Sequence, residues 1–409
     1  MTENSAQKDI AQRGTDRPMT SQDAGTAAIP HALRDGYEVH RAALAAGLDV
    51  VLLPRQVMLV GEGEGTVGRT AFSHGVPQDT TLAGATFAQD KRMRRDLMSK
   101  AGYRVVKGAT FSVGRSRRAA RRYAERVGFP VMIKPAIGDN MSEVIDGIAD
   151  AEQLAEAVDS YVTPPADRPG YTRAAYALTE LREPGVDEDG RVIVPPGYRF
   201  IVEKQPKGQY LRALILDGEV LAVLLFADGV NSTGEQIVDV TEMVHSSVSE
   251  IAVGAAAAVP GVPLSAVDLV VPDHTAETPA RRAVIAEYSE RPWLGLYDEA
   301  APDVAARVAQ RLLHHSIPEL SEAPRAEAIR AEIALEGAVD PQAMVQALST
   351  YSRNGVQLDV AVTDQAMGRI GGVAEGASDS LAALAETLLD EGIDGQRAML
   401  CTLSQSGAV

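Results

Sequence analysis

Two stretches of sequence, SAVDLVV at 265–271 and AVIAEYS at 283–289, decide the fold of this chain. Each has the length and the apolar content of a strand, and together they predict a β-hairpin. Side chains alternate between the two faces of a strand, so Glu287 and Ser289 share a face, and Asp268 on the partner strand can face them. Two carboxylates aimed at one point repel unless a cation lies between them. The hairpin therefore predicts a magnesium site, because hard oxygen ligands suit that ion. Solvated acids on a strand face are the alternative.

A second predicted feature is a pair of lysines placed to bind phosphate. The strand PVMIKPAIG (130–138) delivers Lys134 to a loop that contains Gly138. Backbone amides in such a loop can cradle phosphates, while the lysine supplies a point charge. Lys91 opens a helix, where backbone N–H groups and the helix dipole favour anions. An ordinary solvated lysine is the alternative in both places.

The segment FIVEKQPKG at 200–208 predicts a place where a strand ends in a loop. Glu203 lies at that end, where backbone groups can hold a purine, and an exposed acid is the competing interpretation. Arg212 lies on the following strand and can stabilise negative charge on a transferring phosphoryl group. A cross-strand salt bridge is the alternative for Arg212.

Two other patterns in the sequence do not predict a functional site. The stretch GEGEGTVG at 61–68 contains a GxGxxG match, but its two glutamates would repel a pyrophosphate, so it does not indicate a dinucleotide site. The arginine run at 115–126 is most simply a solvated helix face.

Composition restricts the class of protein. The chain has 409 residues and a formal net charge of −17, which argues against nucleic acid as its main partner. Its one cysteine, Cys401, lies in an apolar run, so it predicts a buried structural thiol and a reducing compartment. No apolar stretch reaches the roughly 20 residues that span a bilayer, and the N-terminus lacks an apolar signal segment. We therefore expect a cytoplasmic protein with no membrane partner.

The pattern of elements divides the chain into five parts. We expect a disordered tail at 1–30, an N-terminal α/β domain at 31–87 and a catalytic domain at 88–318. A Pro/Gly-rich insertion lies near 160–197 within the catalytic domain. A linker at 319–330 leads to a C-terminal domain at 331–409. The C-terminal domain has the element order βαββαβ, which is the ferredoxin-like split motif. The predicted fold class is α+β.

From about Leu82 to about His315 the order and spacing of these motifs resemble the ATP-grasp superfamily, and most of all its amino-acid ligases. These include cyanophycin synthetase, the ligase half of bifunctional glutathione synthetase, and D-alanine–D-alanine ligase. The stretches that carry the resemblance are AQDKRMRRDLMSKAGYRV, ERVGFPVMIKPAIGDN, FIVEKQPKGQYLRALILDGEVLAV, AVDLVVPD and VIAEYSERPWL. The resemblance implies two α+β lobes that grip ATP, with Mg²⁺ (Mn²⁺ as a substitute) as the metal.

The same resemblance implies roles for individual residues. It assigns phosphate binding to Lys91 and Lys134, the adenine hinge to Glu203 and Lys204, and the metal ligands to Asp268, Glu287 and Ser289. The predicted catalytic residues are Arg212 and Lys134, and Gly138 and Tyr210 complete the predicted nucleotide-binding residues. Three positions depart from the family pattern. Met141 follows Gly138 where glycines are usual, Ser289 replaces an asparagine, and Tyr210 replaces an acid that often holds the ribose.

The C-terminal part, from about Glu332, resembles acylphosphatase in strand order. That family's catalytic arginine falls at Val345 and its asparagine at Thr363, so the resemblance implies a structural, dimerising or docking module without hydrolase activity.

The expected reaction joins a small-molecule carboxylate to an amine through an acyl phosphate, with ADP and phosphate released. An amino acid or short peptide is the expected substrate. Three alternatives stay open: a phosphotransferase, a carboxylase-type enzyme, and an ATP-binding regulatory or scaffold protein that has lost its chemistry. A homodimer is compatible with each.

Overall fold

The computed structural model describes residues 29, 33–62, 70–138, 143–164, 184–195, 197–232, 236–297, 302–320, 328–351 and 355–405. Within these ranges the chain forms two compact units. One takes residues 79–292, and the other takes the residues up to 78, 293–297 and those from 302 onward. Nearly all of the predicted tail, the GxGxxG match from residue 63, Met141 and residues 165–183 of the predicted insertion lie outside the described residues.

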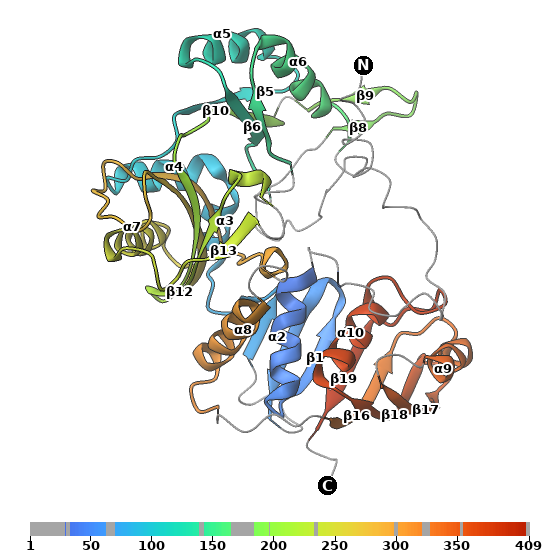
Figure 1. The fold of residues 1–409 in the computed structure, drawn as a ribbon. Helices are drawn as coiled ribbons and strands as arrows, with labels where there is room; N and C mark the ends of the chain where they lie inside the picture. Colours follow the sequence, from blue (N-terminus) through green and yellow to red (C-terminus); the bar gives the residue numbers. More distant parts are fainter. Residues whose placement is uncertain are drawn as a thin grey trace. The chain divides into compact units, whose positions relative to one another are not determined.

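The unit of residues 79–292 contains two antiparallel sheets (Figure 1). The smaller sheet has the strand order β5 (Gly108–Ser112), β10 (Arg199–Lys204), β6 (Val131–Pro135) and β7 (Ile145–Ile148). The larger sheet has the order β13 (Ile237–Asp239), β12 (Glu219–Phe226), β11 (Gln209–Leu216), β14 (Leu264–Val271) and β15 (Val284–Ser289). A separate hairpin joins β8 (Gly185–Val186) to β9 (Val192–Ile193).

Each sheet in this unit is covered by helices on one face. Helices α5 (Arg117–Val127) and α6 (Ala151–Ser160) pack on the smaller sheet through an apolar cluster that includes Ala120, Ala124 and Ile133. Helices α3 (Leu82–Gln89) and α7 (Ser246–Ala257) pack on the larger sheet, beside α4 (Lys91–Lys100). Since strand residues alternate faces, residues next to the buried apolar ones, such as Lys134, point to the other face of the sheet.

Local sequence explains where these elements begin and turn. The Asp90 side chain accepts a hydrogen bond from the Arg92 amide at 2.9 Å and so separates α3 from α4. Asp217 and Gly218 have φ values of 49° and 78°, the backbone geometry of the tight hairpin that the DG dipeptide predicts.

The other unit is built on one eight-stranded sheet. Its order is β17 (Gln357–Asp364), β18 (Arg369–Gly376), β16 (Ile329–Glu336), β19 (Leu400–Ser404), β1 (Asp49–Leu53), β2 (Val57–Gly61), β3 (Thr70–Ser73) and β4 (Val76–Pro77). Four helices accompany it: α2 (Arg34–Ala45), α8 (Pro302–Ser316), α9 (Pro341–Thr350) and α10 (Ser378–Leu389). Three short 3₁₀ turns, Pro54–Gln56, Gly229–Asn231 and Leu294–Leu296, complete the described elements.

This sheet joins two segments that the sequence predicted to be separate domains. Strand β1 pairs with β19, with Val50 opposite Leu403 and Leu52 opposite Cys401 (Figure 1). Helix α8, which the sequence assigned to the catalytic domain, packs against α2 in this unit. The physical reason is that alternation predicts which face of a strand is buried but not which distant strand it pairs with.

The C-terminal segment follows the predicted element order, from β16 through α9, β17, β18 and α10 to β19. The helices and the antiparallel sheets confirm the α+β class. None of the described helices is both long and apolar enough to cross a bilayer.

Candidate nucleotide and metal site

The two predicted metal ligands lie opposite each other on neighbouring strands. Asp268 on β14 is paired in register with Glu287 on β15, directly before a β-bulge. Both side chains are buried, with 1% and 8% of their surface exposed. The hairpin therefore places two carboxylates on one face of the sheet, as the sequence predicted.

Asp268 is held by groups on β11. The Arg212 guanidinium donates from Nε to Oδ1 at 2.6 Å and from Nη2 to Oδ2 at 2.8 Å. The Tyr210 hydroxyl also donates to Oδ2, at 2.6 Å. Burial and the neighbouring Asp268 charge raise the pKa of Tyr210 well above its ordinary value, so the hydroxyl stays protonated and remains a donor. The cross-strand salt bridge considered as an alternative for Arg212 is present.

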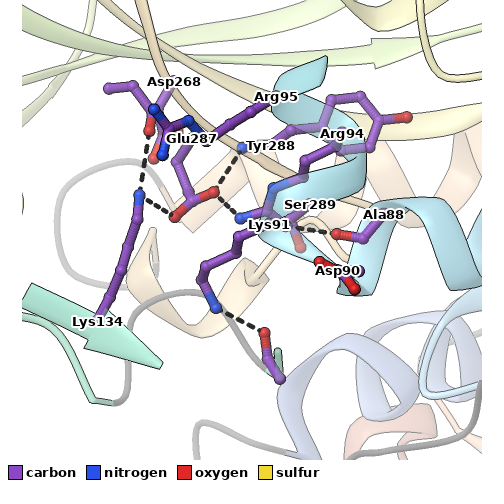
Figure 2. Close-up of polar contacts among 12 residues, drawn as sticks. Ala88, Asp90, Lys91, Arg94, Arg95, Lys134, Asp268, Glu287, Tyr288 and Ser289 are labelled. Atoms are coloured by element: carbon purple, nitrogen blue, oxygen red, sulfur yellow. Dashed lines mark hydrogen bonds and ion pairs between the residues drawn. The ribbon is translucent and has the colours of Figure 1, made fainter. Parts of the chain in front are cut away.

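Glu287 is held by cations from two other elements (Figure 2). Lys134 on β6 donates from Nζ to Oε2 at 3.0 Å. Arg94 on α4 forms an ion pair with Oε1. Burial lowers the pKa of Arg94 to about 10, so it is still a cation at neutral pH.

Lys134 connects Glu287 to the predicted hinge acid. Its ammonium lies 2.8 Å from Glu203 Oε2, and Glu203 Oε1 lies 3.2 Å from Arg95 Nη1. Burial lowers the pKa of Lys134, while the Glu203 charge opposes that shift. The result is a chain of alternating charges that runs from Arg94 through Glu287, Lys134 and Glu203 to Arg95. All of its members are buried except Arg95, which is half-buried.

A cavity of about 310 Å³ opens beside this chain of charges. This volume is at the low end of the range for small-molecule pockets. It is lined by Met132, Lys134, Val144, Asp146, Gln205, Pro206, Gly208, Tyr210, Ala227, Asp228, Gly229, Val230, Asp268, Val270, Ala286 and Glu287. Its apolar residues include Met132, Val144 and Val270, and its charged residues are Lys134 and four acids, Asp146, Asp228, Asp268 and Glu287. Because the acids outnumber the lysine, an anionic ligand would need a cation bound beside these carboxylates.

The donor set fits a hard divalent cation. Asp268 and Glu287 both line the cavity and offer carboxylate oxygens, and such an ion takes one or two carboxylates together with phosphate oxygens and water. Ser289 is not among the lining residues, and its hydroxyl accepts a hydrogen bond from the Arg291 amide at 3.1 Å. The described residues hold no cluster of three or more acids, histidines or cysteines, so a metal here depends on the ligand for its remaining oxygens.

Several predicted binding residues lie just outside the cavity lining. Lys91 donates to the Gly138 carbonyl at 2.8 Å (Figure 2). Lys204 donates to the carbonyls of Gly128 and Phe129 at 2.7 and 2.9 Å. These two lysines thus anchor the backbone on either side of β6, and their predicted contacts with a nucleotide stay predictions.

The sequence analysis did not predict two arginines of this site, Arg94 and Arg95. On α4 the helical spacing of Met93, Leu97 and Met98 predicts an apolar face. The buried positions are instead Lys91, Arg94 and Met98, and Met93 is 42% exposed. The signal for Arg94 was its position three residues after Lys91, which puts both on one helix face. A cation on a buried helix face needs an acid partner, and Glu287 is that partner.

Comparison with known proteins supports the nucleotide assignment. Residues 90–160 match the family model of the carbamoyl-phosphate synthase L chain ATP-binding domain. This match agrees with the predicted resemblance to ATP-binding enzymes, for residues 90–160 alone. No curated protein sequence matches the chain.

Solved structures with a similar arrangement include ATP-grasp ligases. A bifunctional glutathione synthetase from Pasteurella multocida is 17% identical with a TM-score of 0.38, over 65% of this chain and 41% of that one. A D-alanine–D-alanine ligase from Bacillus anthracis is 15% identical with a TM-score of 0.40, over 59% of this chain and 69% of that one. The match thus spans less than half of the glutathione synthetase, and the activity must be argued from the site itself.

Proposed function

We propose that this protein is an ATP-dependent, ADP-forming ligase that joins a carboxylate to an amine. The observation that carries the proposal is the cavity in which Asp268 and Glu287 face Lys134 beside an apolar wall. The family-model match at 90–160 supports ATP as the nucleotide. An amino acid or short peptide as the carboxylate rests on the resemblance of the sequence motifs to the amino-acid ligases.

The proposed roles follow from charge and position. The apolar region around Met132 and Val270 holds the adenine, and Lys134 faces the phosphates. A substrate carboxylate then attacks the γ-phosphorus, the bond from that phosphorus to the bridging oxygen breaks, and ADP leaves. The amine attacks the acyl carbon, and inorganic phosphate leaves. The protein acts by positioning and by neutralising charge, so no nucleophilic side chain is required.

Asp268 and Glu287 would hold Mg²⁺ (or Mn²⁺), which neutralises phosphate charge when bound. Arg212 orients the Asp268 carboxylate and balances its charge, and Arg94 does the same for Glu287. Both arginines are at most 2% exposed, so water does not screen their charge.

The experiment is an ADP-release assay with pools of amino acids and short peptides, with and without an added amine. Ligase activity requires ADP release that depends on both a carboxylate and an amine, together with an amide product seen by mass spectrometry. Release that needs bicarbonate in place of an organic carboxylate would support a carboxylase-type enzyme instead. Magnesium-dependent ATP binding without turnover on any pool would contradict the ligase proposal and support a regulatory ATP-binding protein.

A further inference from the structure

Helix α5 carries a row of arginines on its outer side that the nucleotide site does not use. Six arginines occur between residues 115 and 126, in a chain whose acidic residues outnumber its basic ones by 56 to 39. The buried side of α5 consists of Ala120 and Ala124. At 100° per residue, Arg118, Arg122 and Arg126 lie on the side opposite those alanines. We call these three residues the arginine face, and each is exposed.

Most of this face lacks acidic partners. Arg117 and Arg121, on the flank of the helix, pair with Asp159 and Glu125. For Arg118 and Arg122 no ion pair is found with any residue that the structure describes. Arg126 stacks over the Tyr123 ring at 5.3 Å and keeps its charge available.

The arginine face works against the stability of its own helix. Arginines spaced four apart repel one another by about 0.2–0.5 kcal/mol per pair. Arg117 and Arg118 also lie in the first turn, which has no acid, at the end of the helix where the dipole favours negative charge. The cap residue Ser116 makes no side-chain hydrogen bond that would offset this. The ion pairs of Arg117 and Arg121 offset this repulsion only in part, and such a break of local rules is expected where residues serve function rather than stability.

We propose that the arginine face of α5 is a docking site for an acidic polypeptide segment whose carboxylates recur one helical turn apart. The three arginines span about 12 Å along the helix, since each residue rises about 1.5 Å. That length matches three carboxylates spaced one turn apart on a partner helix. Guanidinium groups bind carboxylates through bidentate hydrogen bonds, so the contact depends on the orientation of both groups as well as on their charges.

A nucleic acid is a poorer fit to the same face. Proteins that bind nucleic acid through phosphates neutralise many of them, and about 6–10 contacts are usual for strong binding. The arginine face offers three cations in a chain of net charge −17, so a long polyanion would also meet repulsion from the rest of the protein. A short acidic segment avoids that repulsion. This proposal does not depend on the proposed ligase activity.

The test uses the full chain and a fluorescein-labelled helical peptide with glutamate at every fourth position. Its controls are the same peptide with glutamine in those places and a short oligothymidylate. The variant replaces Arg118→Gln together with Arg122→Gln. A matched control replaces the exposed Arg281→Gln and Arg282→Gln, which removes the same charge elsewhere. Fluorescence anisotropy at low salt measures binding, and circular dichroism measures Tm.

We expect the acidic peptide to bind the parent chain and the Arg281/Arg282 control alike. Binding to the Arg118/Arg122 variant should weaken about tenfold, the effect of losing two exposed ion pairs. The Tm of that variant should stay the same or rise, because repulsion within α5 is relieved. The proposal would be overturned if the acidic peptide does not bind the parent chain, or if it binds the Arg118/Arg122 variant equally well. It would also be overturned if the oligothymidylate binds more tightly than the peptide, or if the Tm of the variant falls while its binding stays unchanged.

Discussion

Replacing Glu287 by glutamine tests the candidate site most directly. Glutamine keeps the size of the side chain but leaves Arg94 and Lys134, which are 2% and 3% exposed, facing a neutral amide. Removing one partner of a buried ion pair costs about 3–5 kcal/mol. Lys134 retains its 2.8 Å contact with Glu203, so we expect the lower end, about 3 kcal/mol. For a unit of this size that is a fall in Tm of roughly 6–12 °C.

The same variant should lose activity for a separate reason. If Glu287 holds the metal beside the phosphates, ATP turnover should fall by at least about 10²-fold, as when a group that stabilises transition-state charge is removed. The magnesium concentration for half-maximal binding of a non-hydrolysable ATP analogue should rise as well. Calorimetry of magnesium binding in the presence of the analogue measures this without any turnover.

A double-mutant cycle separates the two effects. Arg94→Met removes the cation that Glu287 neutralises, so the Arg94→Met, Glu287→Gln double variant should recover stability, with a coupling energy of about 2 kcal/mol. It should not recover turnover. Glu125→Gln, which breaks the exposed Arg121 pair, is the matched control and should change stability by less than about 0.5 kcal/mol. Full turnover in the Glu287→Gln enzyme, or restored turnover in the double variant, would refute the metal assignment.

Three further predictions follow from particular contacts. Tyr210→Phe removes one 2.6 Å hydrogen bond to Asp268, so the apparent KM for magnesium should rise several-fold at fixed ATP. An unchanged KM for magnesium would show that the Tyr210 hydroxyl does not position the Asp268 carboxylate. Burial raises the pKa of Cys401 to about 12, so a thiol reagent at pH 8 should label the folded chain far more slowly than the unfolded chain. The free energy of unfolding should fall as the pH rises from about 9 towards 12, because only the thiol of the unfolded chain ionises in that range. Ending the chain after Leu320 removes strand β19, which pairs with β1, and helix α10, which packs on α2. Limited proteolysis should then digest residues 33–78. A protease-resistant fragment of this region would contradict the sheet that β1 and β19 share.

The hairpin that carries Asp268 and Glu287 was predictable because its signal is local. Alternation along each strand specifies which side chains share a face, and the observed pairing of Asp268 with Glu287 agrees with it. The Asp217–Gly218 turn was predictable for the same reason, since its two residues need a positive φ that these types tolerate.

Features that depend on distant partners were not predictable from one sequence. Helix α2 was missed because its buried positions include Asp35, Glu38 and His40, which break the apolar pattern of a helix. His40 lies 3.4 Å from Glu386, far along the chain, and Gln56 donates to the same carboxylate at 2.9 Å. The buried face of α4 was misassigned for a related reason, because Arg94 occupies a position where the pattern expects an apolar side chain.

The buried charges of the site explain why the sequence could predict the two acids but not every cation that pairs with them. A carboxylate on an apolar strand is visible in the sequence because it interrupts the pattern, but its partner can come from any element. Here the partners come from three: Arg212 from β11, Lys134 from β6 and Arg94 from α4. Because these cations already balance Asp268 and Glu287, the unit does not need a metal in order to fold. In the proposed site a metal would share these carboxylates with the two arginines, because a carboxylate offers about four lone-pair sites. The cycle that joins Arg94 to Glu287 therefore tests the proposed metal binding and the stability of the fold together.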